Sequence, residues 1–96
     1  MIEVTEDAKR FIISMLERSN RPAVKLYLEE QGCNGYKYKW EPVSIGIGDN
    51  IINLDDEHCV IIDNKDYDHF NNCMIVLESS RFDKKLNILN PNVLAR

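Results

Sequence analysis

AVKLYLEEQGCNGYKYKWE, residues 23–41, contains two runs of alternating apolar and polar residues on either side of a short turn rich in glycine. Val24, Leu26 and Leu28 are the apolar members of the first run, and the second run alternates aromatic with charged residues. A period of two is typical of a β-strand with one buried face. The stretch therefore predicts a hairpin whose turn is Gly32-Cys33-Asn34-Gly35.

This turn places one thiol between two glycines. Glycine tolerates positive φ and lets another atom approach the backbone closely. Cys33 in this setting could reach a metal, a cluster or the thiol of a partner. A second interpretation stays open, because glycines also mark ordinary turns in which the cysteine has no role.

Size and charge exclude several classes of protein. A chain of 96 residues forms one small domain, residues 1–96, with a single core. Its net charge of −4 would repel phosphate backbones, so we expect no nucleic-acid partner. No apolar run approaches the ~20 residues of a membrane span, and the acidic start is unlike a targeting peptide. We therefore expect a cytoplasmic protein that does not bind membranes.

The three cysteines, Cys33, Cys59 and Cys73, are odd in number and widely spaced, so a disulfide framework is not expected. No CxxC pair is present to suggest a zinc ribbon or a thioredoxin-type redox motif. Cys59 lies in an apolar run and Cys73 at the start of another. We interpret these two as small hydrophobic residues inside strands.

The flanking segments predict one substantial helix and several further strands. Thr5 can cap a helix whose apolar residues recur at helical spacing from Ala8 to Leu16, and residues 19–22 end it at a proline. The fold class is therefore α+β and mainly β. The other expected elements are strands at 2–4, 51–54, 59–62, 73–78 and 86–89, a loop at 44–50, a short helix or turn at 64–72 and a turn at 83–85.

Other polar clusters are weaker candidates for chemistry. The run Asp55-Asp56-Glu57-His58 could attract a hard cation, but adjacent residues point in different directions, so we interpret it as a solvated turn. Residues 63–68 lack the glycine of a calcium loop and are read as a polar turn. His69 is expected to be a surface or half-buried imidazole. A nucleophilic pair of Cys33 with His69 has no orienting third residue, and we expect no enzyme activity.

Four segments taken together resemble the A-type iron–sulfur carrier family (IscA/SufA/HesB). They are Val4-Thr5 with its helix, residues 26–38, the strand Val60-Ile61-Ile62-Asp63, and the closing Leu89-Asn90-Pro91-Asn92-Val93. Their order and spacing hold over essentially the whole chain. The resemblance implies a single HesB/IscA-like domain, a compact β-sandwich or barrel with an N-terminal helix, in a dimer or tetramer. Members of the family bind iron or an iron–sulfur cluster and deliver it to apo-proteins.

In that family one ligand cysteine lies in the glycine turn and two lie in a C-terminal Cys-Gly-Cys segment. Cys33 matches the first, and the resemblance makes it the metal and cofactor ligand. The other two would be expected just after Arg96, and neither Cys59 nor Cys73 has a matching position. Asn72 replaces a family glycine.

Clusters of two or four irons are normally held by four thiolates or their equivalents. A homodimer would supply two from Cys33, and glutathione, a partner's cysteines or Asp, Glu and His side chains would have to complete the shell. We therefore expect a protein of iron–sulfur cluster assembly with an incomplete metal site. Binding of iron or a cluster by the chain alone is expected to be weak or absent, and assembly proteins or apo-protein clients are the expected partners. The alternative is a non-metal interaction or regulatory module of the same fold that pairs with authentic carriers.

Overall fold

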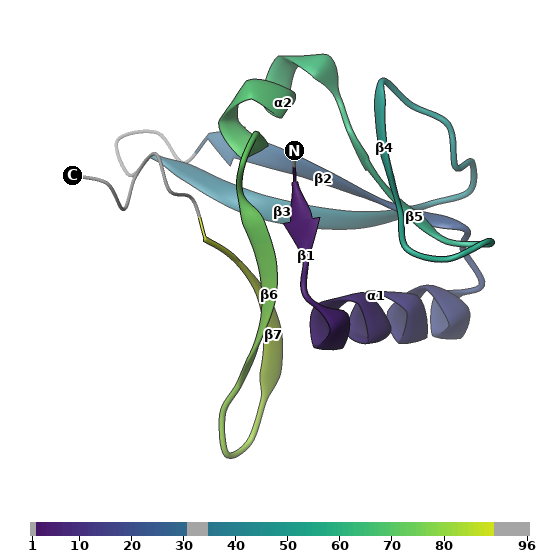
Figure 1. Ribbon diagram of the computed structural model, residues 1–96, viewed down its shortest axis with the longest axis vertical. Helices are drawn as coiled ribbons and strands as arrows, with labels where there is room; N and C mark the ends of the chain where they lie inside the picture. The colour runs from purple at the N-terminus through teal and green to yellow at the C-terminus, as the bar shows by residue number, and fades with distance from the viewer. Residues whose placement is uncertain (1, 31–34, 90–96) are drawn as a thin grey trace.

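The computed structural model describes residues 2–30 and 35–89, apart from the side chain of Tyr36. Two helices and seven strands follow one another along these residues (Figure 1). Their order is β1 (Glu3–Val4), α1 (Glu6–Ser19), β2 (Ala23–Glu30), β3 (Tyr36–Val43), β4 (Asn50–Asn53), β5 (Cys59–Ile62), α2 (Asn64–Phe70), β6 (Met74–Ser79) and β7 (Lys84–Leu89).

The strands form two mixed sheets. The four-stranded sheet has the order β3-β2-β5-β4, and the three-stranded sheet has the order β1-β6-β7. β2 pairs with β5 in parallel and β1 pairs with β6 in parallel, while the remaining pairs are antiparallel. The α+β, mainly β class predicted from the sequence is confirmed. The barrel version of that prediction is wrong for the described residues, because each sheet keeps two edge strands and neither closes on itself.

The β2–β3 hairpin has the faces that the alternation predicts. Leu26 pairs with Trp40 and Leu28 with Tyr38, which places these four side chains on one face. That face packs on the main core, and Leu26 is fully buried. Pro42 lies within β3, where its missing N–H is tolerated because β3 is an edge strand.

Helix α1 begins after Thr5, as predicted, but the cap differs in detail. The hydroxyl of Thr5 donates to Oδ1 of Asp7 at 2.7 Å, and the same oxygen accepts from the N–H of Ala8. These bonds, with that of Thr5 first, lower the pKa of Asp7. The helix ends at Asn20, which takes a left-handed conformation at φ 57°. The end therefore comes from an αL cap, two residues before the proline expected to stop the helix.

The main core lies between α1 and the two sheets. Ile12 and Leu16 face inward from α1 and are fully buried. Phe70 at the end of α2 is 1% exposed and closes the core beside the β2–β3 hairpin. The other buried members are Ile2, Ala8, Val24, Leu26, Leu54, Val60, Ile62, Cys73, Ile75 and Ile88.

A second, smaller cluster lies on the outer face of the four-stranded sheet. Ala23, Cys59 and Ile61 form it, with Val43 against them. The loop between β3 and β4 crosses this cluster, and its backbone comes close at Gly48. A Cβ added at Gly48 would lie 2.2 Å from Cγ2 of Ile61. The glycine is therefore required by close packing at this point.

We expect the substitution Gly48→Ala to lower the free energy of unfolding by about 1–3 kcal/mol, because the new methyl overpacks buried Ile61. Gly46→Ala is the matched control, since its Cβ would lie 3.4 Å from Sγ of Cys59. The control is expected to stay within about 1 kcal/mol of the parent. Urea denaturation of the three proteins tests this, and equal stabilities for both variants would contradict it.

Several boundaries differ by one or two residues from the sequence prediction, which expected β1, β4 and β6 at 2–4, 51–54 and 73–78. The turn between β6 and β7 falls at residues 80–83 and not at 83–85, because the N–H of Ser80 donates to the carbonyl of Asp83 at 2.7 Å. Lys84 and Lys85 instead pair with β6. The short helix or turn expected at 64–72 is the helix α2, and it contains residues 64–68, which were also interpreted as part of a polar turn. Within the described residues, neither helix is long and apolar enough to cross a membrane.

Candidate functional site

The sequence assigns the site to the turn that joins β2 to β3. Glu30 and Tyr36 are the last paired residues of these strands. Cys33 lies outside the described residues, as do residues 31–34 generally and the closing Asn90–Val93 segment. Gly35 is described and has φ +85°, a conformation that side chains rarely adopt. One of the two turn glycines therefore has the backbone geometry for which glycine is suited.

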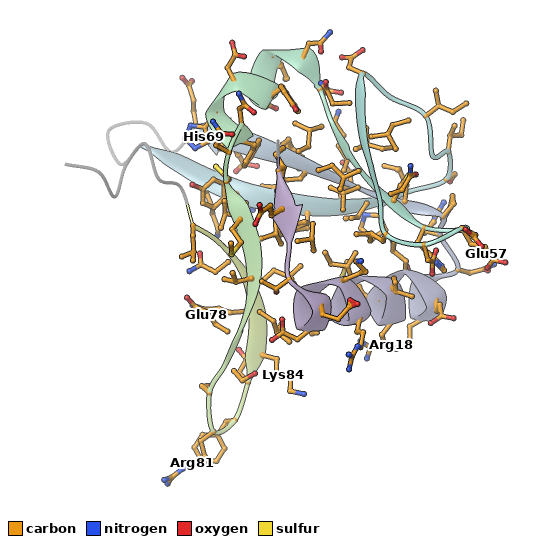
Figure 2. The ribbon with its side chains drawn as sticks, in the orientation of Figure 1. Arg18, Glu57, His69, Glu78, Arg81 and Lys84 are labelled. Carbon is orange, nitrogen blue, oxygen red and sulfur yellow. The ribbon has the colours of Figure 1, made fainter. Side chains whose placement is uncertain are left out.

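Helix α2 brings His69 against β3 at this end of the sheet (Figure 2). Nε2 of His69 lies 3.4 Å from the hydroxyl of Tyr38, and the rings of both residues contact Phe70. Burial raises the pKa of Tyr38, and the neighbouring Cys73 adds to the shift. His69 is half-buried, as the sequence predicted. The ring nitrogen of His69 and the hydroxyl oxygen of Tyr38 thus lie together beside the β2–β3 hairpin.

Sequence reasoning missed the Tyr38–His69 contact. It described the second run of residues 23–41 only as aromatic residues alternating with charged ones, and it paired His69 only with Cys33. The signal available was the alternation in β3, which puts Tyr38 on the same face as Trp40. The packing of α2 onto that face, however, depends on the path of the chain after β5.

The other two cysteines are buried, as predicted, but Cys73 lies just before β6 and not inside a strand. Cys59 is 7% exposed and Cys73 is 1% exposed. Burial raises the pKa of both thiols, which leaves them protonated near neutral pH. The thiol of Cys73 donates to the carbonyl of His69 with a sulfur–oxygen distance of 3.4 Å. Neither sulfur is presented as a metal ligand, since the thiolate is the coordinating form.

The acidic run after β4 forms a turn held by its own first carboxylate. Oδ1 of Asp55 accepts from the backbone N–H groups of Glu57 and His58 and lies 2.9 Å from Nδ1 of His58. These contacts, with the N–H of Glu57 first, lower the pKa of Asp55. The run is thus organised as a turn. Over residues 2–30 and 35–89, no three His, Cys, Asp or Glu side chains are grouped to hold a metal ion.

One further ion pair lies at the end of β5. Nζ of Lys25 lies 2.9 Å from Oδ2 of Asp63, and this bond raises the pKa of Lys25. The nearby Asp66 also raises the pKa of Lys25. Oδ2 of Asp66 is buried and accepts no hydrogen bond from the described residues. The alternation over residues 23–41 places Lys25 on the polar face of β2, but it does not indicate the partner of Lys25.

The arrangement of the two mixed sheets with α1 and α2 is the fold of A-type iron–sulfur carriers. SufA of Escherichia coli, described as involved in biosynthesis of iron–sulfur clusters, superposes with a TM-score of 0.78 at 16% identity over 94% of this chain and 80% of SufA. IscA with a [2Fe-2S] cluster gives 0.75 at 13% identity, over 96% of this chain and 86% of IscA.

A protein from Aquifex aeolicus solved by NMR gives a TM-score of 0.67 at 22% identity, over 94% of this chain and 91% of that protein. No protein-family model and no curated protein matches the sequence. The fold that the sequence resemblance implied is therefore confirmed by solved structures. The likeness is one of fold.

Proposed function

We propose that this protein acts in iron–sulfur cluster assembly as a carrier-like protein, without enzyme activity of its own. The observation that carries the proposal is the agreement of two independent lines: the fold of SufA and IscA, and the glycine-flanked Cys33 between β2 and β3. The cluster is cargo, held for transfer to an apo-protein.

Cys33 is the proposed ligand. Thiolates are the usual ligands of iron–sulfur clusters, and four of them or their equivalents hold two- or four-iron types. The other two thiols of residues 1–96, those of Cys59 and Cys73, are buried and are therefore not proposed as ligands. We propose that glutathione, the cysteines of a partner or Asp, Glu and His side chains complete the ligand shell, and such ligands would hold the cluster loosely and exchangeably.

One described neighbour of the hairpin supports a ligand role at this end of the sheet. His69 offers a ring nitrogen and is held in place by contacts with Tyr38 and Phe70. The raised pKa of Tyr38 keeps its hydroxyl protonated, so Tyr38 positions His69 and is not itself proposed as a ligand. The expected partners are assembly proteins that load the cluster and apo-proteins that accept it. The expected compartment is the cytoplasm, where thiols stay reduced.

Transfer of a cluster to an acceptor tests the proposal. The protein is loaded anaerobically with iron, sulfide and glutathione, desalted and mixed with an apo-ferredoxin of the [2Fe-2S] type. Circular dichroism of the ferredoxin is expected to appear faster than in a mixture without the protein that contains the same iron, sulfide and glutathione. Equal rates would contradict a carrier role. Stable complexes with authentic carriers, formed without iron, would then support the interaction-module alternative.

A further inference from the structure

Strand β4 is an edge of the four-stranded sheet, and within the described residues it pairs only with β5. The N–H of Leu54 donates to the carbonyl of His58 at 2.9 Å, so these two residues form a hydrogen-bonded pair that continues the β4–β5 register. Hydrogen-bonded and non-hydrogen-bonded pairs alternate along antiparallel strands. Ile51 and Asn53 therefore direct their backbone N–H and C=O groups away from β5, toward the edge of the sheet.

The other sheet edges in the described part of the chain carry features that discourage pairing. β3 contains Pro42 and two lysines, β7 begins with two lysines, and β1 has only two residues. Lysine, proline and short length commonly keep an edge strand from pairing with another chain. β4 has the sequence Asn-Ile-Ile-Asn, with neither lysine nor proline. Among these edges, β4 is therefore the best suited to accept a further strand.

The outer face beside this edge exposes isoleucine side chains. Ile51 lies opposite Ile61 of the outer cluster, so its side chain is on that face, and it is 45% exposed. In the β3–β4 loop the two glycines approach the sheet, whereas Ile45 and Ile47 are 65% and 78% exposed. Figure 1 shows this loop and β4 together at one side of the molecule, away from the β6–β7 hairpin. An extended segment added at β4 would therefore meet apolar side chains on this face.

The surroundings of this apolar face are acidic. Residues 40–64 contain six acidic residues and no lysine or arginine. Asp49 precedes β4 and the 55–58 turn follows it, so exposed carboxylates lie at both ends of the strand. A hollow of about 190 Å³ between the loop and this turn is lined by Asn53 and Asp56, among others. Lysine or arginine side chains at the ends of a docked segment would be attracted to these carboxylates.

Basic side chains from neighbouring elements do not cancel this charge. Nζ of Lys25 is paired with Asp63 at 2.9 Å. Arg21 contacts the hydroxyl of Ser44, and Lys65 lies on α2 directly after residue 64. Five of the six acidic residues therefore stand against Arg21 and Lys65. The charge around β4 stays negative.

We propose that β4 accepts an extended segment of a partner protein, with apolar side chains at the centre of that segment and lysine or arginine at its ends. The backbone of the segment pairs with Ile51 and Asn53, and its basic ends lie near Asp49 and the 55–58 turn. Two β4 edges would instead bring acidic ends together, so charge disfavours a second copy of this chain. The surface goes beyond the proposed function, because it uses neither iron nor Cys33.

Fluorescence anisotropy of a labelled peptide tests the proposal on the metal-free protein. The probe is Lys-Thr-Val-Thr-Val-Lys, and the control probe has glutamate in place of both lysines. The lysine peptide is expected to bind saturably, and the glutamate peptide about tenfold more weakly or less. Bound peptide is expected to slow hydrogen exchange at Ile51 and Asn53, whose N–H groups face the edge. No saturable binding of the lysine peptide, or equal binding of both peptides, would overturn the proposal.

The substitution Asn53→Pro separates edge pairing from other ways of binding the peptide. Proline removes the outward N–H of residue 53 and leaves the bonds between β4 and β5. It is expected to raise the dissociation constant about fivefold or more. Asn53→Thr is the matched control, because it keeps the N–H, and it is expected to bind within about twofold of the parent. Thermal melts verify that both variants are folded.

The substitution Asp56→Lys tests the role of charge. It is expected to raise the dissociation constant of the lysine peptide about threefold or more. Glu78→Lys is the matched control, because it changes the net charge equally on β6, and Figure 2 shows Glu78 far from Glu57 of the acidic turn. The control is expected to bind like the parent.

Two further outcomes would each overturn the proposal. One is an equal effect of Asp56→Lys and Glu78→Lys, and the other is an Asn53→Pro variant that binds like Asn53→Thr. Cys33→Ser is expected to bind the peptide like the parent. Failure of the carrier function would therefore leave peptide binding intact, and failure of peptide binding would leave the carrier function intact.

Discussion

The substitution Phe70→Ala is expected to lower the free energy of unfolding by about 3–5 kcal/mol. Phe70 is 1% exposed, and its ring contacts Tyr38 and His69 with centroid distances of 5.7 and 5.4 Å. Truncation leaves a cavity where α2 meets the β2–β3 hairpin. Small domains have a total stability of about 5–15 kcal/mol, so the variant is expected to be partly unfolded at moderate temperature.

Phe82→Ala gives the control for the same chemical change, because Phe82 is 93% exposed. The stability of Phe82→Ala is expected to lie within about 0.5 kcal/mol of the parent. Urea denaturation followed by circular dichroism measures both. A loss below about 1 kcal/mol for Phe70→Ala would show that α2 is not packed as described.

The local elements of this fold could be predicted because their causes are local. The alternation over residues 23–41 gave the correct faces of β2 and β3, with Leu26 opposite Trp40. The helical spacing from Ala8 to Leu16 gave the buried face of α1. Cys59 and Cys73 were correctly placed inside because both stand in apolar runs.

The arrangement of these elements could not be derived from the same patterns. The parallel pairing of β1 with β6 joins Val4 to Ile75, and no local signal specifies a contact over that separation. The resemblance supplied the overall fold, but its barrel version was wrong. The β6–β7 turn was misplaced because Asp83 and the two lysines after it suggested a turn, whereas strand pairing places Lys84 opposite Ser79.

In the candidate site, too, the local feature could be predicted and the tertiary contacts could not. The sequence indicated Cys33 through its flanking glycines, and that assignment stays a prediction because residues 31–34 lie outside the described part of the chain. The neighbours of the hairpin were not predicted, since His69 reaches Tyr38 only through the packing of α2. Side chains brought together by tertiary structure leave little trace in residue spacing.

The second large effect is expected at Cys33. Cys33→Ser replaces a thiolate by a hydroxyl that stays protonated at neutral pH and binds iron far more weakly. Bound iron is expected to fall about tenfold or more after reconstitution. Cys59→Ala is the matched control, because Cys59 is a buried thiol whose pKa is raised. The control is expected to keep the iron content of the parent, since no ligand is lost.

The most direct measurement of the central claim is the iron and acid-labile sulfide bound per chain after anaerobic reconstitution with glutathione, determined for the parent, Cys33→Ser and Cys59→Ala together. We predict a visible chromophore with iron and sulfide in equal amounts for the parent and for Cys59→Ala, and its loss in Cys33→Ser. A chromophore that persists in the folded Cys33→Ser variant would contradict the assignment of Cys33 as the ligand.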